Sequence, residues 1–415
     1  MISSKRLFSV QNLFYGLLFL FPIAGNSIKS WTSAIYWSLF IVSLFLFRTS
    51  RCLKSEFHPR EKLVLVSIVG IFVAMLISST FAGWGYQQIK GLDVQFRYLA
   101  FLPIYFAFRF GRGGIDWLTK GMLIGSLVLL GQAIYDIEVL ELERAYGMYG
   151  SPGLFAFQAL IYGLFLVRAG IRCSRHIMFI NFFGAIVCFI ALLLSGSRST
   201  YFTVLAATPV ILLVFFSRRV RIYSAIFLLT ILPILYLAIP PVHHQVNKAV
   251  DEVSAYFSNH KADEKWEDGS VAARFAMWHA ALVIAKDNPI VGIGWRNFSD
   301  FSAAYADAGL IAPEGSRHPH PHNTYLEFLV TNGLIGFILL CALLVSSYRT
   351  RTADNSQNIT QDVWLKVFIV FFAINAINEG GAIIYGNSAA FFFVAFGALL
   401  ASCYQSKGFL KPSSH

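Results

Sequence analysis

Apolar segments of about 20 residues follow one another along almost the whole chain, and this repetition restricts the fold more than any other feature. Hydrophobic residues make up 56% of the 415 positions, and charged residues make up only 13%. Soluble domains carry about 25% charged residues, so this composition excludes a water-soluble fold. The sequence predicts an all-α polytopic membrane protein.

Twelve segments have the length and apolarity of a spanning helix. They are 12–28, 31–47, 63–82, 95–109, 119–137, 153–168, 177–196, 200–217, 222–240, 324–347, 365–384 and 389–405. These segments divide the chain into three regions. Residues 1–240 contain the first nine spans, residues 241–323 form one long loop in which we expect helices, and residues 324–415 contain the last three spans and a tail.

The 33 Lys and Arg residues give a net charge of +11, but they lie in small clusters between the spans. This distribution is typical of residues that set membrane orientation, and it does not favour nucleic-acid binding. Clusters at 48–62, 168–175 and 218–221 fall on one side of the predicted membrane. By the positive-inside rule, both termini are cytoplasmic and the loop 241–323 is exported, in a bacterium to the periplasm. No cleavable signal peptide is expected, because the first apolar segment runs into the second without a small-residue cleavage site.

The cysteines give no sign of a disulfide or of structural zinc. All five fall in spans or in cytoplasmic connections, and no two have the Cys-x-x-Cys spacing of a zinc site. They are Cys52, Cys173, Cys188, Cys341 and Cys403.

The exported loop contains one well-defined helical pattern. Between 271 and 286, small and aliphatic residues recur every three or four positions, which predicts a helix with one apolar face. Ser270 or Asp268 is expected to cap its start, and Pro289 ends it. Arg274 lies in the first turn, where the helix dipole attracts anions and repels cations. An arginine there adds to an anion site, and a solvated surface arginine is the alternative.

Closely spaced glycines occur at two places after this helix. Gly292 and Gly294 lie in the sequence Asn-Pro-Ile-Val-Gly-Ile-Gly-Trp, without the strand and third glycine of a dinucleotide-binding fingerprint. We predict a tight turn here, in which one backbone segment approaches another. Gly333 and Gly336, inside the tenth span, are expected to let neighbouring helices approach closely.

Three histidines alternate with two prolines at the end of the exported loop, at His318, His320 and His322. Three imidazoles so close in sequence suggest a metal site. In polyproline geometry, however, the three rings diverge, and no carboxylate lies nearby in the sequence. We therefore favour a site without metal.

His322 lies where the chain enters the membrane, because the span 324–347 follows it directly. Asn323 or Thr324 is the expected N-cap of that span. Glu327 falls one turn into the span, as its N-terminal carboxylate or as the partner of an arginine. An acid inside a membrane helix is a functional candidate.

Arg198 lies in the sequence Ser195-Gly-Ser-Arg-Ser-Thr200, between two spans and on the exported side. This position runs against the positive-inside bias. Snorkelling toward lipid headgroups is one explanation. The glycine and the four hydroxyl residues favour another, a tight polar turn suited to phosphate oxygens, which a guanidinium grips with two parallel hydrogen bonds.

Three of these motifs occur in a set order along the C-terminal half of the chain. They are Gly196-Ser197-Arg198-Ser199, the helix of Arg274 with the 288–294 turn after it, and His322-Asn323 followed by Gly333-Leu-Ile-Gly336. With the large exported loop between spans nine and ten, they resemble the O-antigen ligase and polymerase family of bacterial surface-polysaccharide enzymes. Arg144 and the Gly-Ser-Pro turn that follows it look like a further family element.

The resemblance implies a GT-C type glycosyltransferase that moves a glycan from undecaprenyl diphosphate to an acceptor on the outer face of the bacterial inner membrane. In the ligase branch, the donor carries O-antigen and the acceptor is lipid A-core, so the reaction completes lipopolysaccharide. The resemblance implies no cofactor, neither nucleotide nor metal. The implied partners are the two lipid-linked glycans and the membrane lipids.

The chemistry of this reaction assigns roles to the conspicuous residues. A neutral imidazole suits the base that takes the proton of the acceptor hydroxyl, and we assign this role to His322. Fixed cations stabilise a departing diphosphate, so Arg198 and Arg274 are expected to hold it. A single displacement then inverts the anomeric centre. Further candidates for lining the donor or acceptor site are Arg317, His318, His320, Asn323, Glu327 and Arg144.

Two other functions stay open. A polymerase that joins repeat units on the lipid carrier uses the same donor and chemistry, although the chain length and the single late loop favour the ligase. A transporter or flippase is expected to show paired halves and charges near the midplane. The chain shows no such halves, although Asn375, Asn378 and Glu379 in the eleventh span are polar.

Overall fold

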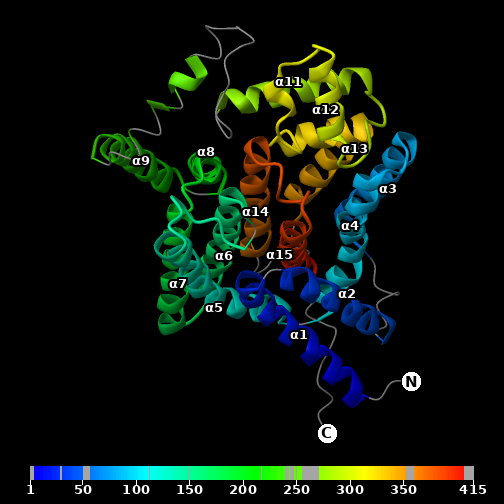
Figure 1. Cartoon of the computed structure of the whole chain (residues 1–415). Coiled ribbons are helices and arrows are strands. Elements are labelled where there is room, and N and C mark those ends of the chain that lie inside the picture. Colours follow the sequence, from blue (N-terminus) through cyan, green and yellow to red (C-terminus); the bar gives the residue numbers. More distant parts are fainter. Residues whose placement is uncertain are drawn as a thin grey trace.

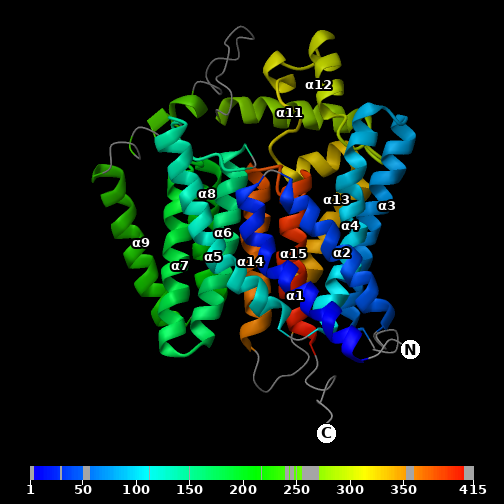
Figure 2. The same ribbon diagram turned by 60° about the horizontal axis from the view of Figure 1, so that its bottom comes forward.

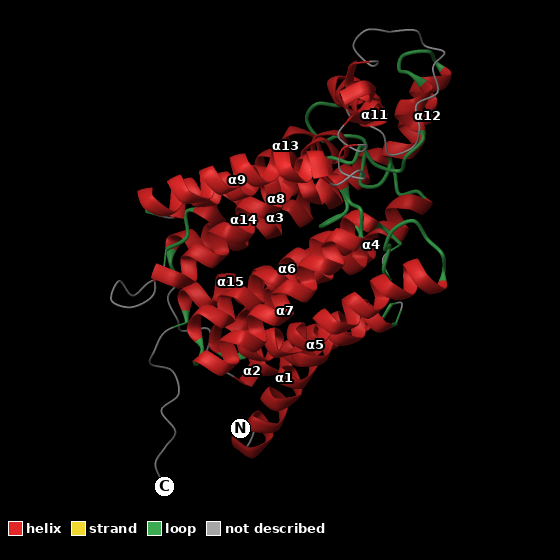
Figure 3. Cartoon of the chain, turned by 90° about the vertical axis from the view of Figure 1, so that its left-hand side faces the viewer, coloured by secondary structure: helices red, strands yellow, loops and turns green. Residues whose placement is uncertain are grey.

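A computed structural model of the protein describes residues 4–28, 30–49, 57–111, 113–148, 150–215, 217–238, 243, 247–248, 250–254, 271–351 and 359–405. All regular elements in these residues are helices (Figure 3). The predicted all-α class is therefore confirmed for the described part of the chain.

The long helices stand side by side in one bundle (Figures 1 and 2). The first nine are α1 (Ser4–Ser27), α2 (Trp31–Thr49), α3 (Pro59–Ala82), α4 (Tyr86–Phe110), α5 (Gly114–Ile134) with a π-helical turn η2 (Tyr135–Val139), α6 (Pro152–Arg172), α7 (Arg175–Leu194), α8 (Arg198–Phe215) and α9 (Arg218–Ala238). The last three are α13 (Thr324–Tyr348), α14 (Ile359–Asn378) and α15 (Gly386–Tyr404).

Eight helices in the described residues are long and apolar enough to cross a membrane. They cover Pro59–Ala82, Gly114–Val139, Pro152–Arg172, Arg175–Leu194, Arg198–Phe215, Thr324–Tyr348, Gln361–Asn378 and Gly386–Tyr404. Two shorter apolar helices, Ser9–Gly25 and Trp31–Phe47, accompany them. The protein is therefore built as a polytopic membrane protein. Each of the twelve predicted spans overlaps a helix, but the count of twelve crossings stays a prediction.

Helix α15 runs through the middle of the bundle (Figure 2). All of its residues from 389 to 404 are buried, as expected for a helix that is apolar on every face. Aromatic rings fill the contacts, with Phe391 against Phe21 at 5.2 Å and Phe393 against Phe101 at 5.5 Å between ring centroids. Such van der Waals contacts stabilise helix packing in a bilayer, where lipid weakens the hydrophobic driving force.

The long loop contributes α11 (Val271–Asp287), α12 (Phe298–Asp307) and a short 3-10 helix η3 (Pro313–Ser316), which lie over one end of the bundle (Figure 1). The start of α1 and the end of α15 lie at the opposite end (Figure 2). The helix predicted at 271–286 is confirmed as α11. Its predicted caps, Ser270 and Asp268, lie outside the described residues, and the amide of Val271 donates to Glu252 Oε2 at 2.8 Å.

The glycine turn of the loop inserts into a break in α13. Gly333 has a φ of 63°, and the amides of Ile293 and Gly294 donate at 3.0 Å to the carbonyls of Val330 and Thr331 just before it. A Cβ on Gly333 would overlap the carbonyl oxygen of Ile290. The predicted close backbone approach is thus present. The prediction that Gly333 serves contact between membrane helices was wrong, because its neighbour is the loop.

Candidate active site

Five chain segments meet at the end of the bundle beneath α11. They are the start of α6, the start of α8, the first turns of α11, the loop before α13 and the turn after α14. Each brings one polar or glycine residue of the site: Gly153, Arg198, Arg274, His322 and Glu379. The site therefore depends on segments that are far apart in the sequence.

Arg198 is the first residue of α8 and follows a sharp turn from α7. Gly196 has a φ of 58°, in the left-handed region that glycine enters without strain. The hydroxyl of Ser197 lies 3.0 Å from that of Ser199 and 3.2 Å from that of Thr200, and all three are buried. These hydroxyls lie close to one another and shape the turn. The Arg198 side chain, 35% exposed, is the group that a phosphate can reach.

Arg144 lies against the same turn. A Cβ on Gly196 would lie 3.4 Å from Arg144 Cβ, and the Arg144 guanidinium stacks 5.4 Å from the ring centroid of Tyr146. The buried carboxylate of Asp136 accepts the amides of Tyr146 and Gly147 at 2.8 and 2.7 Å, which fixes this loop. The structure thus brings a second exposed arginine next to the Arg198 turn.

Arg274 and Arg198 are linked through Glu252. The carboxylate of Glu252 lies 3.8 Å from Arg198 Nη1 and also accepts the amide of Val271, one turn before Arg274. Burial lowers the pKa of Arg274; the positive charge of Arg198 adds to this effect, and the carboxylates of Glu379 and Glu252 oppose it. Two arginines therefore lie close enough to repel each other, an arrangement that binding of an anion would relieve.

The three histidines converge. The ring centroid of His322 lies 4.2 Å from that of His320 and 5.2 Å from that of His318. The sequence prediction that the rings diverge was wrong, because His322 has a φ of 49° and turns the chain back on itself, and its amide donates to His320 Nδ1 at 3.2 Å. The described residues contain no group of three or more His, Cys, Asp or Glu side chains arranged to hold a metal ion.

The electrostatic surroundings favour neutral imidazoles. Burial lowers the pKa of His322 to about 2, and the nearby His320, Arg274 and His318 add to the effect. Burial likewise lowers the pKa of His320 to about 3, with contributions from His318, Arg274 and Arg296. Both rings are therefore uncharged at neutral pH, so His322 has a free lone pair with which to accept a proton.

Glu379 lies next to His322, although the sequence prediction did not place it in the site. Its Oε1 lies 3.9 Å from His322 Nδ1, and its side chain is 7% exposed. The sequence prediction put it inside a span of 365–384, but α14 ends at Asn378 and leaves Glu379 in the turn that follows. The pair of glycines after this acid was the only signal of such a turn.

The Glu379 carboxyl is firmly held. The Gly381 amide donates to Oε1 at 3.3 Å, and a Cβ on Gly153 would overlap Oε2. Burial raises the pKa of Glu379, while Arg274 and the amides of Gly381 and Gly380 favour its ionised form. The arrangement is thus a buried carboxyl between a neutral imidazole and an arginine.

Comparison with known proteins gives a family match over part of the chain. Residues 183–341 match the profile of the O-antigen ligase family. This stretch of the chain is therefore similar to O-antigen ligases. The matched region runs from α7 into α13 and includes Arg198, Arg274 and His322, whereas Arg144 and Glu379 lie outside it.

Two relatives extend the comparison. An uncharacterized protein of Haemophilus influenzae is 22% identical over 300 residues, which cover 71% of this chain and 73% of the relative. The exopolysaccharide production protein ExoQ of Rhizobium meliloti is 34% identical over 86 residues, which cover 20% of this chain and 19% of ExoQ.

The other predicted site residues lie around the histidines. Arg317 pairs with Glu314 at 3.3 Å, and the Asn323 side chain caps α13 by accepting the amide of Leu326 at 3.1 Å. The predicted N-cap is therefore confirmed, and the Asn323 side chain is engaged in it. Glu327 is 1% exposed, and its Oε2 has no hydrogen-bond partner among the described residues.

Arg296 and Tyr385 also lie beside the histidines, and the sequence prediction missed both. The Tyr385 ring centroid lies 5.4 Å from that of His320, and the charge of Arg296 acts on His320. Arg296 has a φ of 67°, which follows from the glycine turn inserted into α13. No local pattern marks either residue, because both reach the site only through packing.

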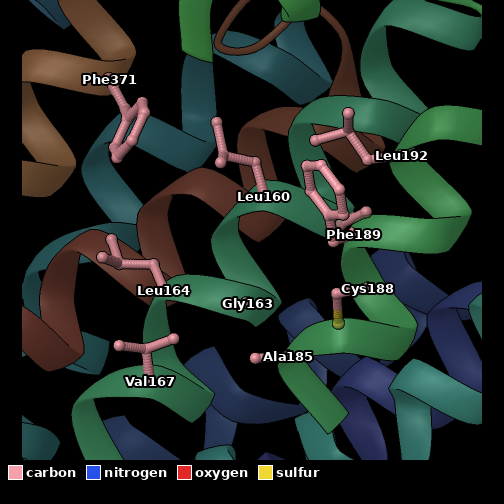
Figure 4. A pocket seen from close by; sticks show the side chains of 10 residues that line it. Leu160, Gly163, Leu164, Val167, Ala185, Cys188, Phe189, Leu192 and Phe371 are labelled. Carbon is pink, nitrogen blue, oxygen red and sulfur yellow. The ribbon is translucent and has the colours of Figure 1, made fainter. Parts of the chain in front are cut away.

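An apolar groove of about 230 Å³ lies beneath the Arg198 turn (Figure 4). Its walls come from α6, α7 and α14, with Leu160, Gly163, Cys188, Phe189 and Phe371 among the lining residues. Phe189 is 52% exposed, so the groove reaches the outer surface of the bundle. At its upper end, the carbonyl of the lining residue Leu192 accepts the Ser195 hydroxyl at 2.6 Å, which joins the groove to the turn that carries Arg198.

Proposed function

We propose that this protein is an O-antigen ligase. It is an inverting glycosyltransferase that moves O-antigen glycan from undecaprenyl diphosphate to a sugar hydroxyl of lipid A-core, at the periplasmic face of the bacterial inner membrane. The observation that carries the proposal is the meeting of two arginines and a neutral imidazole at one end of a membrane bundle. The positive-inside distribution of charge supports the periplasmic orientation, and a GT-C type arrangement of twelve spans remains part of the proposal.

The arginines act on the donor. Arg198 and Arg274 bind the diphosphate, and Arg144 adds a third guanidinium beside the same turn. Guanidinium binds phosphate through paired hydrogen bonds and stays charged at any ambient pH. Because negative charge grows on the diphosphate as it departs, fixed cations stabilise the transition state more than the ground state.

His322 acts on the acceptor. Its imidazole accepts the proton of the acceptor hydroxyl while the hydroxyl oxygen forms a bond to the anomeric carbon of the donor sugar. The bond between that carbon and the phosphate oxygen breaks, and its electron pair leaves with undecaprenyl diphosphate. The imidazolium then gives its proton to water. One displacement at the anomeric carbon inverts its configuration, as in inverting glycosidases.

The groove beneath Arg198 suits the lipid part of the donor. It is lined by apolar side chains and reaches the outer surface of the bundle, and its lining residue Leu192 lies three residues before the turn that carries Arg198. A polyprenyl chain attached to a diphosphate at Arg198 would have its first units in this groove. Arg317, His318, His320 and Glu327, which lie within five residues of His322 in the sequence, are assigned to the acceptor side.

A polymerase that uses the same lipid-linked donor is the second candidate. The relative named for exopolysaccharide production supports it, although the similarity covers only 20% of this chain. The two enzymes share the chemistry of His322 and the arginines and differ in the acceptor. A transporter or flippase has less support. A cluster of cations and imidazoles suits catalysis as well as substrate binding, so it does not favour transport.

The deciding experiment uses purified protein in lipid nanodiscs with undecaprenyl diphosphate-linked glycan and lipid A-core. We expect a glycan joined to lipid A-core, formation of free undecaprenyl diphosphate, and the same rate in the presence of EDTA. Longer chains still attached to the lipid carrier would identify the polymerase. Strong inhibition by EDTA would favour a metal ion bound by the clustered histidines. Absence of any joined product with either acceptor would overturn the proposal.

A further inference from the structure

The contact between His322 and Glu379 is built by both backbone and side chains. Thr324 lies two residues after His322, and its hydroxyl donates to the main-chain oxygen of Glu379 at 2.9 Å. The Gly381 amide holds Oε1, and Gly153 leaves the room that Oε2 occupies. The carboxyl therefore has a fixed place next to the His322 ring.

The ring nitrogen that faces this carboxyl is Nδ1. The distance to Oε1 is 3.9 Å, and Nδ1 is buried without a hydrogen-bond partner among the described residues. A neutral imidazole carries its proton on one nitrogen and a lone pair on the other. A carboxylate beside Nδ1 favours the proton there and leaves the lone pair on Nε2.

We propose that Glu379 is a positioning residue that orients the imidazole of His322 and selects Nε2 as the atom that takes the acceptor proton. The inference rests on the proposed function and adds a residue outside the region that matches the O-antigen ligase profile. As the proton moves from the acceptor hydroxyl to Nε2, the new imidazolium lies beside the Glu379 carboxyl, whose ionised form is favoured by Arg274 and the amides of Gly381 and Gly380. The contact of 3.9 Å shortens to a hydrogen bond in the complex, as catalytic contacts commonly do.

A competing role for Glu379 is to neutralise Arg274. The two groups interact electrostatically, and Glu379 makes the largest charge contribution to the pKa of Arg274. In that role, the carboxylate would tune how tightly the donor diphosphate binds and would leave the proton transfer alone. The two roles differ in the kinetic parameter that they change, because Arg274 acts through donor binding and His322 acts through turnover.

The test compares Glu379→Gln with wild-type protein in the nanodisc transfer assay. We expect kcat to fall about 100-fold, the size of a typical general-base contribution, with the donor KM changed less than about twofold. The variant Glu379→Gln/His322→Ala should be no slower than His322→Ala alone, because the two residues act as one unit. Asp307→Asn, the same charge change at the exposed end of α12, should leave both parameters unchanged.

The pH profile provides a second readout. Within the described residues, the charged and titratable groups facing His322 are His318 and His320 from its own loop, Arg274 from α11 and Glu379 from the turn after α14. A carboxylate raises the pKa of a neighbouring imidazole. The acid limb of the profile, the pH range in which kcat falls as the pH is lowered, should therefore move to lower pH in Glu379→Gln.

Glu379→Asp protects the test against a folding defect, because it keeps the charge in a shorter side chain. It should keep the wild-type acid limb and be faster than Glu379→Gln. The inference fails if wild-type protein transfers glycan and Glu379→Gln keeps normal kcat, changes only KM, or is no slower than Glu379→Asp. A wild-type protein that transfers nothing would instead overturn the proposed function.

Discussion

The hydroxyl of Thr324 donates a hydrogen bond of 2.9 Å to the main-chain oxygen of Glu379. The first residue of α13 is thereby joined to the turn that follows α14. Since His322 lies two residues before Thr324, this bond sets the register between the imidazole and the carboxyl. The same turn lies beside Gly153 of α6, so three helix ends are tied together at the candidate site.

Replacing Thr324 with Val should weaken this register. Val keeps the shape and loses the hydroxyl, so the Glu379 carbonyl loses a buried donor and the free energy of unfolding should fall by about 1 kcal/mol. We expect turnover to fall about tenfold, because a small misplacement of a catalytic group is costly. Thermal unfolding in detergent and the transfer assay measure the two effects. Thr324→Ser restores the hydroxyl and is the control, and full turnover in Thr324→Val would contradict this account.

Substitution of Arg198 or Arg274 should weaken donor binding, whereas substitution of Lys286 in α11 should not. Arg198→Lys and Arg274→Lys keep the charge but lose paired hydrogen bonding, so the donor KM should rise about tenfold or more. Arg198→Ala and Arg274→Ala should abolish transfer at unchanged protein abundance. Lys286→Ala, on the exposed last turn of α11, is the matched control and should bind donor normally. Equal effects of Lys286→Ala would show that general charge, and no particular site, attracts the donor.

Acid should destabilise the histidine cluster. The pKa of His322 is about 2 in the folded protein and 6.5 ordinarily, so the unfolded chain takes up the proton first as the pH falls. The stability contributed by the neutral ring is complete above about pH 6.5 and is lost progressively toward pH 2. We expect the Tm of His322→Gln to fall less than that of wild type between pH 7 and pH 5. His279→Gln removes an exposed histidine of α11 and should leave the wild-type slope.

Gly333 should tolerate no side chain. Its φ of 63° and the nearby carbonyl of Ile290 leave no room for a Cβ, so Gly333→Ala should lower the free energy of unfolding by more than about 2 kcal/mol. Gly131→Ala in α5 is the control, because a Cβ there meets nothing within 4 Å. That change should be neutral or stabilising by up to about 1 kcal/mol. The amounts of folded protein and the Tm values in detergent measure both, and equal stability of the two variants would refute the steric argument.

The groove should discriminate between lipid carriers. A Cβ on Gly163 would lie 3.7 Å from Cys188 Cβ, an ordinary contact, so Gly163→Ala fits while Gly163→Phe fills the groove. With a long polyprenyl donor, Gly163→Phe should raise KM about tenfold or more, because burial of each CH₂ contributes about 0.8 kcal/mol. With a short-chain donor, its KM should match that of Gly163→Ala. An equal loss with both donors would show that the groove does not hold the carrier chain.

Much of the fold could be predicted because the bilayer imposes a local requirement. A spanning helix must satisfy its own backbone hydrogen bonds over a set length, so the apolar segments report helices directly. The loop helix at 271–287 and the Asn323 cap could be predicted for a similar reason, since periodicity and capping involve residues within one or two turns. Helix ends could be predicted less well. The predicted span ran to residue 384, whereas α14 ends at Asn378 and leaves Glu379 in the turn that follows.

The sequence by itself determined that the chain is helical and membrane-embedded, and its ordered motifs marked Arg198, Arg274 and His322 as candidates. Only the tertiary structure decided that these residues meet, that the histidine rings converge, and that Glu379, Arg296 and Tyr385 lie among them. The physical reason is the range of the interactions involved. Helix formation depends on neighbours along the chain, whereas the site depends on which helix ends come together when α15 is enclosed by the rest of the bundle.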